Sequence, residues 1–397
     1  MFKAKLSKWG VLTLLLASTL PSQAGEIEEL KETVQLLLQR IEALETEQKE
    51  IAVAQEAIVE EVENSAASQL AQWAEKTTVG GYGEVHWNNT NLTDEIDVHR
   101  FVLFFGHQFT DDLRFFSEVE LEHALSGEGK NGEVELEQAY IEYDINDQHQ
   151  VKGGVFLLPV GILNETHEPN TFYGVERNNV EKNIIPTTWW EAGAMFSGEL
   201  GGGFGYNLAV HSGLEASKSG AFTFLPRDGR RKVSEAPAED AAVTARLKYT
   251  GVPGLELSAT VQHQGDLTQS DAGTDEAEGL LTETHAVFNR GPFGLRALYA
   301  MWDIDGDEAK ALGRDEQEGW YIEPSYRINE NWGVFARRSY WDNEAGNSVD
   351  SEYKQTDIGI NYWPNEKVVI KFDWMDKDAP SGKSDEDGVN LGIGYQF

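Results

Sequence analysis

Apolar positions repeat every seven residues in the N-terminal part of the chain. Residues 26–63 contain no Gly or Pro, and their repeat keeps one apolar seam on one face of a helix. The a positions are Ile27, Val34, Ile41, Gln48, Gln55 and Val62, and the d positions are Leu30, Leu37, Leu44, Ile51 and Ile58. The repeat predicts an α-helical coiled coil over residues 25–63. It is lost over residues 64–76, which we interpret as a linker.

A two-residue alternation replaces the heptads from Thr77 onward. The chain ends in GVNLGIGYQF (388–397), in which alternate residues are apolar or aromatic. Successive side chains of a strand point to opposite faces, so such segments predict strands with one apolar face. We expect sixteen of them, at about 77–88, 95–108, 113–124, 133–144, 149–158, 189–199, 203–212, 241–250, 254–264, 280–290, 293–302, 318–328, 331–341, 353–363, 366–375 and 387–397.

The connections between these strands alternate between short turns and long polar segments. The long segments are 89–94, 125–132, 159–188, 213–240, 265–279, 303–317, 342–352 and 376–386. Tight turns at one end and long loops at the other are typical of outer-membrane barrels with an even number of antiparallel strands. The sequence therefore predicts an all-β fold, a 16-stranded antiparallel transmembrane β-barrel over residues 77–397, preceded by the coiled coil. A soluble β-sandwich is the alternative.

The C-terminal alternation predicts the strand that closes such a barrel. The last strand must pair with the first, because an open sheet edge in lipid would leave backbone groups without hydrogen bonds. The final aromatic residues, Tyr395 and Phe397, also resemble the closure signal that the barrel-insertion machinery reads.

Composition and charge place this barrel in a compartment. Lys3, Lys5 and Lys8, a short apolar stretch and a small-residue cleavage site predict a signal peptide over residues 1–24. The chain lacks Cys and has a net charge of -36, which disfavours nucleic acid as a partner. We expect the barrel in the outer membrane, in contact with lipid and lipopolysaccharide, with the coiled coil in the periplasm.

Charged residues within the alternating strands are expected to line the pore. An ionised side chain facing lipid at mid-membrane costs about 2–4 kcal/mol for Arg or Lys, so these residues should point inward. The predicted pore-lining residues are Arg100, Arg114, Glu118, Glu120, Arg246, Lys248, Arg296, Glu323, Arg327, Lys371 and Asp373. Arg337 and Arg338 cannot both face inward in a regular strand, so we expect a bulge or an interfacial position there.

The segment 158–190 is too long and too apolar to be a solvated tip. We expect it to fold inward as a constriction loop, burying its apolar side chains against the wall and directing charges toward the axis. The charged candidates are Glu165, His167, Glu168, Arg177, Glu181 and Lys182. A cap over the mouth or a contact between subunits is the alternative. Loop 213–240 holds a basic cluster, Arg227, Arg230, Arg231 and Lys232, which either attracts anions or pairs with neighbouring acids.

Motifs for catalysis, cofactors and metals are weak. The segment Asp303 to Glu308 has some features of a calcium loop, but Arg314 occupies the expected position of the bidentate acid. We interpret it as a solvated acidic loop. We therefore expect a protein that is not an enzyme and that uses no cofactor or metal.

Residues 100–122, 134–145 and 151–162 resemble the phosphate-selective porin superfamily of Gram-negative bacteria. The resemblance implies a 16-stranded trimeric channel whose inner loop narrows the pore, with basic residues that select phosphate. This chain reads Phe156-Leu157-Leu158-Pro159 where the family commonly has Lys, and it is strongly acidic. We therefore expect a porin for passive diffusion of ions and small hydrophilic solutes.

Two other functions stay open. A coiled coil before a similar barrel is similar to siderophore-uptake porins, so a specific channel for a siderophore or another organic solute is one alternative. An envelope tether that reaches peptidoglycan, with the barrel as its anchor, is the other. Val and Ile at a with Leu at d favour two helices, whereas Ile at d and the Gln layers favour more. We expect a homotrimer, because the barrel family is trimeric.

Overall fold

The computed structural model describes residues 24–63, 66–270 and 276–397, and the chain divides into two compact units after Trp73. The predicted signal peptide, residues 1–24, lies outside the described residues except for Ala24. Helix α1 (Ala24–Glu63) spans the heptad segment as one unbroken helix. Its seam residues, among them Leu30, Leu37 and Leu44, are exposed. The segment 64–76, interpreted above as a linker, is helical over α2 (Ala66–Glu75).

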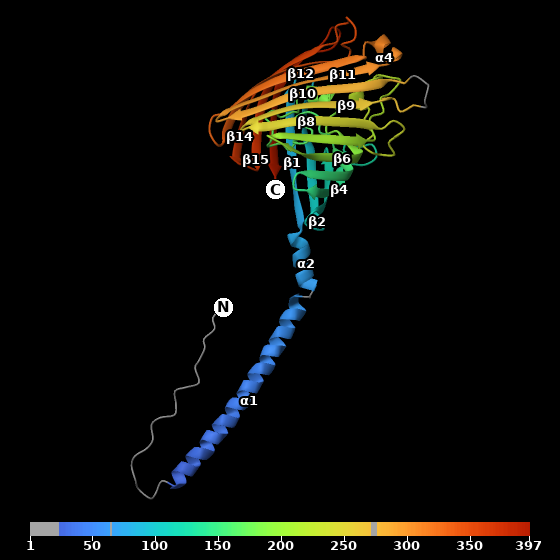
Figure 1. Cartoon of the computed structure of the whole chain (residues 1–397). Coiled ribbons are helices and arrows are strands. Elements are labelled where there is room, and N and C mark those ends of the chain that lie inside the picture. Colours follow the sequence, from blue (N-terminus) through green and yellow to red (C-terminus); the bar gives the residue numbers. More distant parts are fainter. Residues whose placement is uncertain (1–23, 64–65, 271–275) are drawn as a thin grey trace. The chain divides into compact units, whose positions relative to one another are not determined.

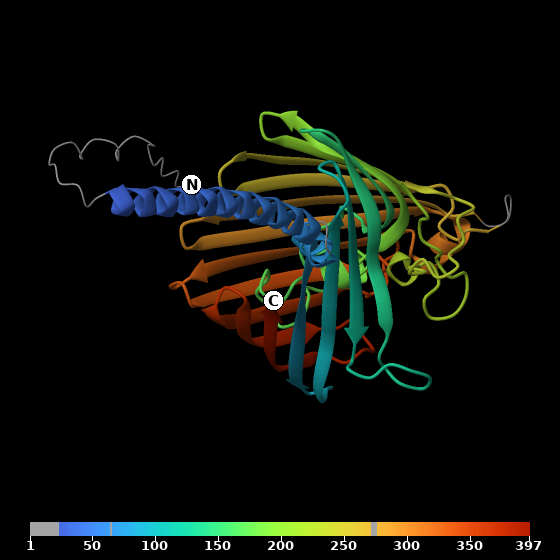
Figure 2. The ribbon, with the colours of Figure 1, turned by 90° about the horizontal axis from the view of Figure 1, so that it is seen from below.

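Sixteen antiparallel strands form a closed barrel in which each strand pairs with its neighbours in sequence, which confirms the predicted fold (Figures 1 and 2). The first eight are β1 (Thr77–Thr90), β2 (Asp94–Gln108), β3 (Leu113–Glu122), β4 (Val134–Asn146), β5 (His149–Leu157), β6 (Trp190–Gly201), β7 (Phe204–His211) and β8 (Ala242–Val252). The others are β9 (Leu255–Gln264), β10 (Glu278–Arg290), β11 (Phe293–Asp305), β12 (Glu316–Arg327), β13 (Trp332–Asp342), β14 (Tyr353–Asn365), β15 (Val368–Asp378) and β16 (Glu386–Gln396). All the predicted strands are present, with ends shifted by a few residues.

Strands β1 and β16 close the barrel, as the C-terminal alternation predicted. Their register pairs Tyr82 with Gln396 and continues to Thr90 with Gly388. Phe397 extends the pairing, because its N–H donates to the Gly81 carbonyl oxygen (2.9 Å) and the Gly81 N–H donates back (3.1 Å). Gly81 has no room for a larger residue, since a Cβ there would lie 2.2 Å from the Val102 carbonyl oxygen.

Each strand separates an apolar outer face from a polar inner face. In β15, Phe372 is 43% exposed and Trp374 is similarly exposed, whereas the intervening Lys371 and Asp373 are each 2% exposed. Because the side-chain period of a strand is two, one face of the sheet suits lipid and the other surrounds the interior. The described helices include none that is long and apolar enough to span a membrane.

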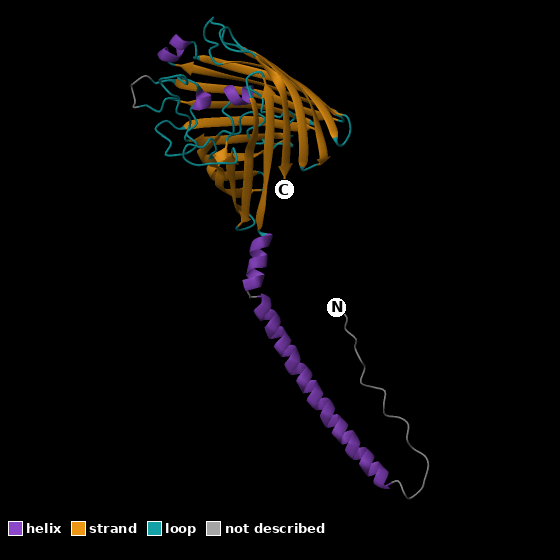
Figure 3. Ribbon diagram, turned by 180° about the vertical axis from the view of Figure 1, so that it is seen from behind, coloured by secondary structure: helices purple, strands orange, loops and turns teal. Residues whose placement is uncertain are grey.

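The connections differ from the prediction at one place. The segment 89–94 is not a long loop: β1 runs to Thr90 and β2 begins at Asp94, and the Thr90 hydroxyl accepts hydrogen bonds from the Leu92 and Thr93 N–H groups. The polar character of this segment is that of a tight turn, since Asn and Thr satisfy turn backbone groups locally. The long connections gather toward one end of the barrel, where α4 (Asp307–Leu312) lies (Figure 3).

A pore lined by an inner loop

The loop between β5 and β6, residues 158–189 and called here the inner loop, lies inside the barrel. It contains the one-turn helix α3 (Val180–Asn183), and its residues contact wall side chains from β2, β8, β11 and β15, which lie far apart around the barrel. A loop that covered only the mouth would not reach these strands. The structure therefore favours the inward fold over the cap.

One face of the inner loop forms an apolar core with the wall. Its buried residues are Leu158, Val160, Ile162, Leu163, Phe172, Val180, Ile184, Ile185 and Trp189, which pack in one cluster with wall residues such as Trp302, Tyr321 and Trp341. The Trp302 indole N–H also donates to the Ile184 carbonyl oxygen (3.0 Å). Burial of this apolar area holds the loop against the side of the barrel that β11 to β13 form.

Glu181 organises the inner loop from within. Its Oε1 accepts hydrogen bonds from the Ile162 and Leu163 N–H groups (2.6 and 2.7 Å), and its Oε2 accepts from Asn178 and from the Tyr321 hydroxyl (2.7 and 3.1 Å). The expectation that this carboxylate is directed toward the axis is wrong: it is buried and holds the loop backbone. Four donors thus satisfy this buried carboxylate, and hydrogen bonds to a charged group are roughly twice as strong as neutral ones.

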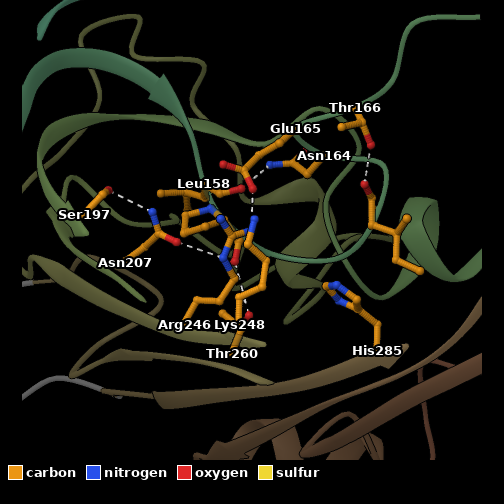
Figure 4. A network of polar contacts seen from close by, with 12 residues as sticks. Leu158, Asn164, Glu165, Thr166, Ser197, Asn207, Arg246, Lys248, Thr260 and His285 are labelled. Atoms are coloured by element: carbon orange, nitrogen blue, oxygen red, sulfur yellow. Dashed lines mark hydrogen bonds and ion pairs between the residues drawn. The ribbon is translucent and has the colours of Figure 1, made fainter. Parts of the chain in front are cut away.

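A polar network joins the inner loop to β8 (Figure 4). The Glu165 carboxylate forms an ion pair with the Arg246 guanidinium, whose Nε donates to Asn207 Oδ1 (2.9 Å). Asn207 in turn donates to the Ser197 hydroxyl (2.8 Å), and the Thr260 hydroxyl donates to the Pro159 carbonyl oxygen (3.2 Å). Two predicted residues, one on the loop and one on the wall, thus come together.

Four further wall residues hold the loop backbone, which the sequence did not indicate. Arg100 donates to the His167 carbonyl oxygen (2.7 Å), Lys371 to that of Gly174 (2.8 Å) and Arg296 to that of Thr171 (2.6 Å). Asp373 accepts from the Val175 N–H (2.7 Å). Predicted as pore charges, these side chains are anchors for the inner loop.

The remaining predicted wall residues lie in three places: near the tight turns, against Trp363, and buried in the interior wall. Arg114 donates to Glu142 and Asp144 (2.7 and 2.6 Å), and with Lys248 it lines a cavity of about 670 Å³ near the tight turns. Arg327 stacks on Trp363, with 3.7 Å between the guanidinium carbon and the ring centre.

Glu323, Glu118 and Glu120 are buried in the interior wall. Glu323 pairs with Arg337 (3.3 Å). Glu118 accepts hydrogen bonds from Tyr82 (3.3 Å) and Gln138 (2.6 Å).

Other polar groups of the inner loop hydrogen-bond within the loop. The Glu168 carbonyl oxygen accepts from the Thr171 N–H (2.9 Å), and Arg177 donates to the Thr188 hydroxyl (3.0 Å). Lys182 and Arg177 line a cavity of about 210 Å³. Burial and then the neighbouring Arg100 lower the pKa of Arg177 to about 10.

Glu176 is a loop residue that sequence reasoning missed. Its carboxylate contacts His86 Nδ1 (2.9 Å) and accepts from Asn88 (3.0 Å). Although burial acts to raise it, the pKa of Glu176 lies well below its usual value because His86 contributes a hydrogen bond and positive charge. An isolated Glu in a loop carries no local signal of such a partner.

The adjacent residues Arg337 and Arg338 face opposite sides of a regular strand. Arg337 points inward and pairs with Asp357 (3.0 Å) as well as Glu323, whereas Arg338 is partly exposed and donates to the Thr356 hydroxyl (2.6 Å). The pairing of β13 with β14 continues through both residues without a bulge, so Arg338 occupies the outward position.

The basic cluster of loop 213–240 is largely neutralised by neighbouring acids. Lys232 contacts Glu133 (2.5 Å) and Glu135, and Arg231 contacts Glu215 (3.0 Å). Arg230 donates to the Thr188 carbonyl oxygen and lies over the Trp190 ring, and Arg227 lies 3.9 Å from Asp228. Of the two readings of this cluster, the structure favours pairing with acids.

Comparisons with known proteins agree with this geometry. The family model described as phosphate-selective porin O and P matches residues 79–397, which is nearly the whole barrel. An uncharacterized protein of Aquifex aeolicus (strain VF5) is 30% identical over 365 residues, covering 84% of this chain and 82% of that protein.

Solved structures share the fold at low identity. The anion-selective porin from Comamonas acidovorans is 12% identical, with a TM-score of 0.58, covering 81% of this chain and 99% of that chain. The trimer form of OmpT, an outer membrane protein of Vibrio cholerae, is 10% identical, with a TM-score of 0.55 and the same coverage. With the family match over the barrel, these findings identify the chain as a member of the phosphate-selective porin O and P family of outer-membrane porins.

Proposed function

We propose that this porin is a weakly selective passive channel for ions and small hydrophilic solutes. One observation carries the proposal: many of the interior cations lie against acids or loop carbonyl groups. Arg100 pairs with Glu84 (2.6 Å), Arg337 with Asp357 (3.0 Å) and Arg246 with Glu165. Adjacent opposite charges cancel at the distance of a passing ion, so such a wall exerts little net selection.

Phosphate selectivity, which the family's name describes, needs cations that are free to bind the anion. Lys371 instead donates to Gly174 and lies 3.5 Å from the centre of the Phe172 ring, and Arg296 donates to Thr171. Releasing these donors to a phosphate ion would also release the loop. We therefore expect phosphate to pass as other small anions do.

Single-channel recording in planar bilayers tests this proposal. We expect open channels with a reversal potential near zero under a KCl gradient, and a KCl conductance that added phosphate does not block. A strong anion preference with block by phosphate would contradict weak selectivity. Conductance that saturates with an organic solute would instead support the alternative of a solute-specific channel. A protein without conductance would support the alternative of an envelope tether.

The assembly is a homotrimer in this proposal. The exposed heptad seam of α1 has apolar residues that need partner helices, and the trimer form of OmpT shares the barrel fold. The three α1 helices form a coiled coil in the periplasm, where it supports trimerisation or contacts peptidoglycan. Residues 1–24 act as the signal peptide of a Gram-negative exported protein.

Lipid and lipopolysaccharide surround the outer face of the barrel, and the insertion machinery reads the C-terminal strand.

Cross-linking of the purified protein tests the trimer. Bands at three times the chain mass should disappear when residues 26–63 are removed, if the coiled coil supplies most of the association. A purely monomeric full-length protein would contradict the proposal.

A further inference from the structure

Three side chains from the wall and the inner loop converge in the barrel interior. Glu118 on β3 and Glu137 on β4 face His167 of the inner loop, and one ligand atom from each lies within 4.8 Å of the others. His167 Nε2 is 3.7 Å from Glu137 Oε2 and 3.9 Å from Glu118 Oε1. Neither distance is a hydrogen bond, so the three atoms surround a small space rather than contact one another directly.

These side chains are buried and incompletely satisfied. Glu118, Glu137 and His167 are 3%, 0% and 3% exposed. Both carboxylate oxygens of Glu137 and the Nε2 of His167 have no hydrogen-bond partner among the described residues. A buried carboxylate without a partner is unfavourable by several kcal/mol, so such a group either takes up a proton or binds a cation.

The nearest cation is already engaged. Arg100 uses its Nε on Glu84 and one terminal nitrogen on the His167 carbonyl oxygen, and the described ion pairs connect no Lys or Arg to Glu118 or Glu137. The two carboxylates therefore have no direct Lys or Arg partner among the described residues.

The histidine is oriented as a ligand. Its Nδ1 lies 3.1 Å from the Asn164 carbonyl oxygen, and because a carbonyl only accepts, Nδ1 carries the proton. In the neutral ring, Nε2 then presents its lone pair to the two carboxylates. Metal-bound histidines commonly have this arrangement, in which the second ring nitrogen donates to a backbone carbonyl group.

We propose that Glu118, Glu137 and His167 bind a divalent transition-metal ion such as Zn²⁺ or Mn²⁺. One imidazole nitrogen and two carboxylate oxygens suit these ions, and water completes the coordination. Bonds of about 2.0–2.2 Å require His167 Nε2 to lie closer to the two carboxylate oxygens than its present 3.7 and 3.9 Å.

The site has a route of entry and a consequence for the channel. Glu137 lines the interior cavity of about 210 Å³, which acidic residues such as Glu120 and basic residues such as Lys182 line together, so an ion in this cavity can reach Glu137. The bound ion would link β3 and β4 to the inner loop across the interior. The loop would then be held by the metal in addition to the Arg100 and Lys371 contacts.

Metal binding to the folded full-length protein in detergent tests the proposal, and it does not depend on conductance. After dialysis against a chelator, titration calorimetry with Zn²⁺ and electron paramagnetic resonance with Mn²⁺ should find one saturable site per chain. Glu137→Gln and His167→Gln should each weaken this site at least ten-fold. His285→Gln is the matched control, because His285 is a buried histidine whose nitrogens already contact Glu283 and Glu256 (2.7 and 3.4 Å).

The control variant should bind the metal as the wild type does. If Glu137→Gln fails to fold, as judged by the heat-modifiable mobility of barrels, the loop variant His167→Gln decides the outcome. A wild-type protein without a saturable site at micromolar Zn²⁺ or Mn²⁺ would overturn the proposal, and a proton shared between Glu120 and Glu137 would then neutralise the cluster. Equal binding by the wild type and both variants would overturn it as well.

Discussion

The Arg100 guanidinium donates a hydrogen bond of 2.7 Å to the main-chain carbonyl oxygen of His167, and so ties the inner loop to strand β2. The same group pairs with Glu84 at 2.6 Å on the neighbouring strand β1. A wall charge of this kind resembles a pore residue in sequence but acts as an anchor. Such side chains therefore affect the width of the pore indirectly, because they hold the inner loop in place.

Arg100→Ala should widen the pore and destabilise the barrel. Removing the guanidinium leaves the buried Glu84 carboxylate with His86 as its remaining partner and leaves the loop carbonyl oxygen without a donor, and loss of one partner of a buried pair costs about 3–5 kcal/mol. We expect a larger and noisier single-channel conductance and a lower urea midpoint. Arg231→Ala, which removes an exposed arginine of loop 213–240, is the control and should change the midpoint little. Unchanged conductance in Arg100→Ala would show that the apolar core alone holds the loop.

Glu165→Gln should shift selectivity toward anions. The change removes the negative partner of Arg246 and leaves its positive charge facing the interior. Reversal potentials under a KCl gradient measure the shift, and Arg246→Met should move them in the opposite direction. In a double-mutant cycle on urea unfolding, we expect a coupling of about 0.5–3 kcal/mol between the two positions. A coupling of zero would mean that the ion pair in Figure 4 does not form in solution.

Glu176→Gln should reveal a pH-dependent contribution to stability. The pKa of Glu176 is lowered in the folded protein, so its contribution is present above the usual carboxyl pKa of about 4.3 and is lost as the pH falls toward the folded value. The free-energy difference between wild type and variant should be constant from pH 7 to about pH 5 and then shrink on acidification. Urea unfolding at each pH measures it. A difference that grows below pH 5 would contradict the lowered pKa.

Deletion of Phe397 should impair barrel closure. The deletion removes the two backbone hydrogen bonds with Gly81 and the contact of the Phe397 ring with Phe101, whose ring centres are 6.1 Å apart. Two such hydrogen bonds contribute about 1–3 kcal/mol together. We expect a smaller heat-modifiable folded fraction after refolding, whereas Phe397→Tyr, which keeps the backbone pairing and the ring, should fold like the wild type. Equal refolding of the deletion variant would show that strand β16 closes without its last residue.

Much of this architecture can be predicted from the local periodicity of the sequence alone. A heptad requires a helix and a two-residue alternation requires a strand, and both patterns depend on residues only a few positions apart. The helix over 24–63, the sixteen strands and the closure through Phe397 could therefore be predicted. So could the inward direction of Lys371 and Asp373, since their neighbours Phe372 and Trp374 must face lipid.

Only the tertiary structure decided what the inward charges do. The contacts of Arg246 with Glu165 and of Lys371 with Gly174 join residues far apart in the sequence, and no local pattern records such a pair. The inner loop has no period of its own, so its position follows from apolar burial and from anchors on strands around the barrel. The meeting of Glu118, Glu137 and His167 depends on that position, because a loop residue can complete a site on the wall only after the loop has folded inward.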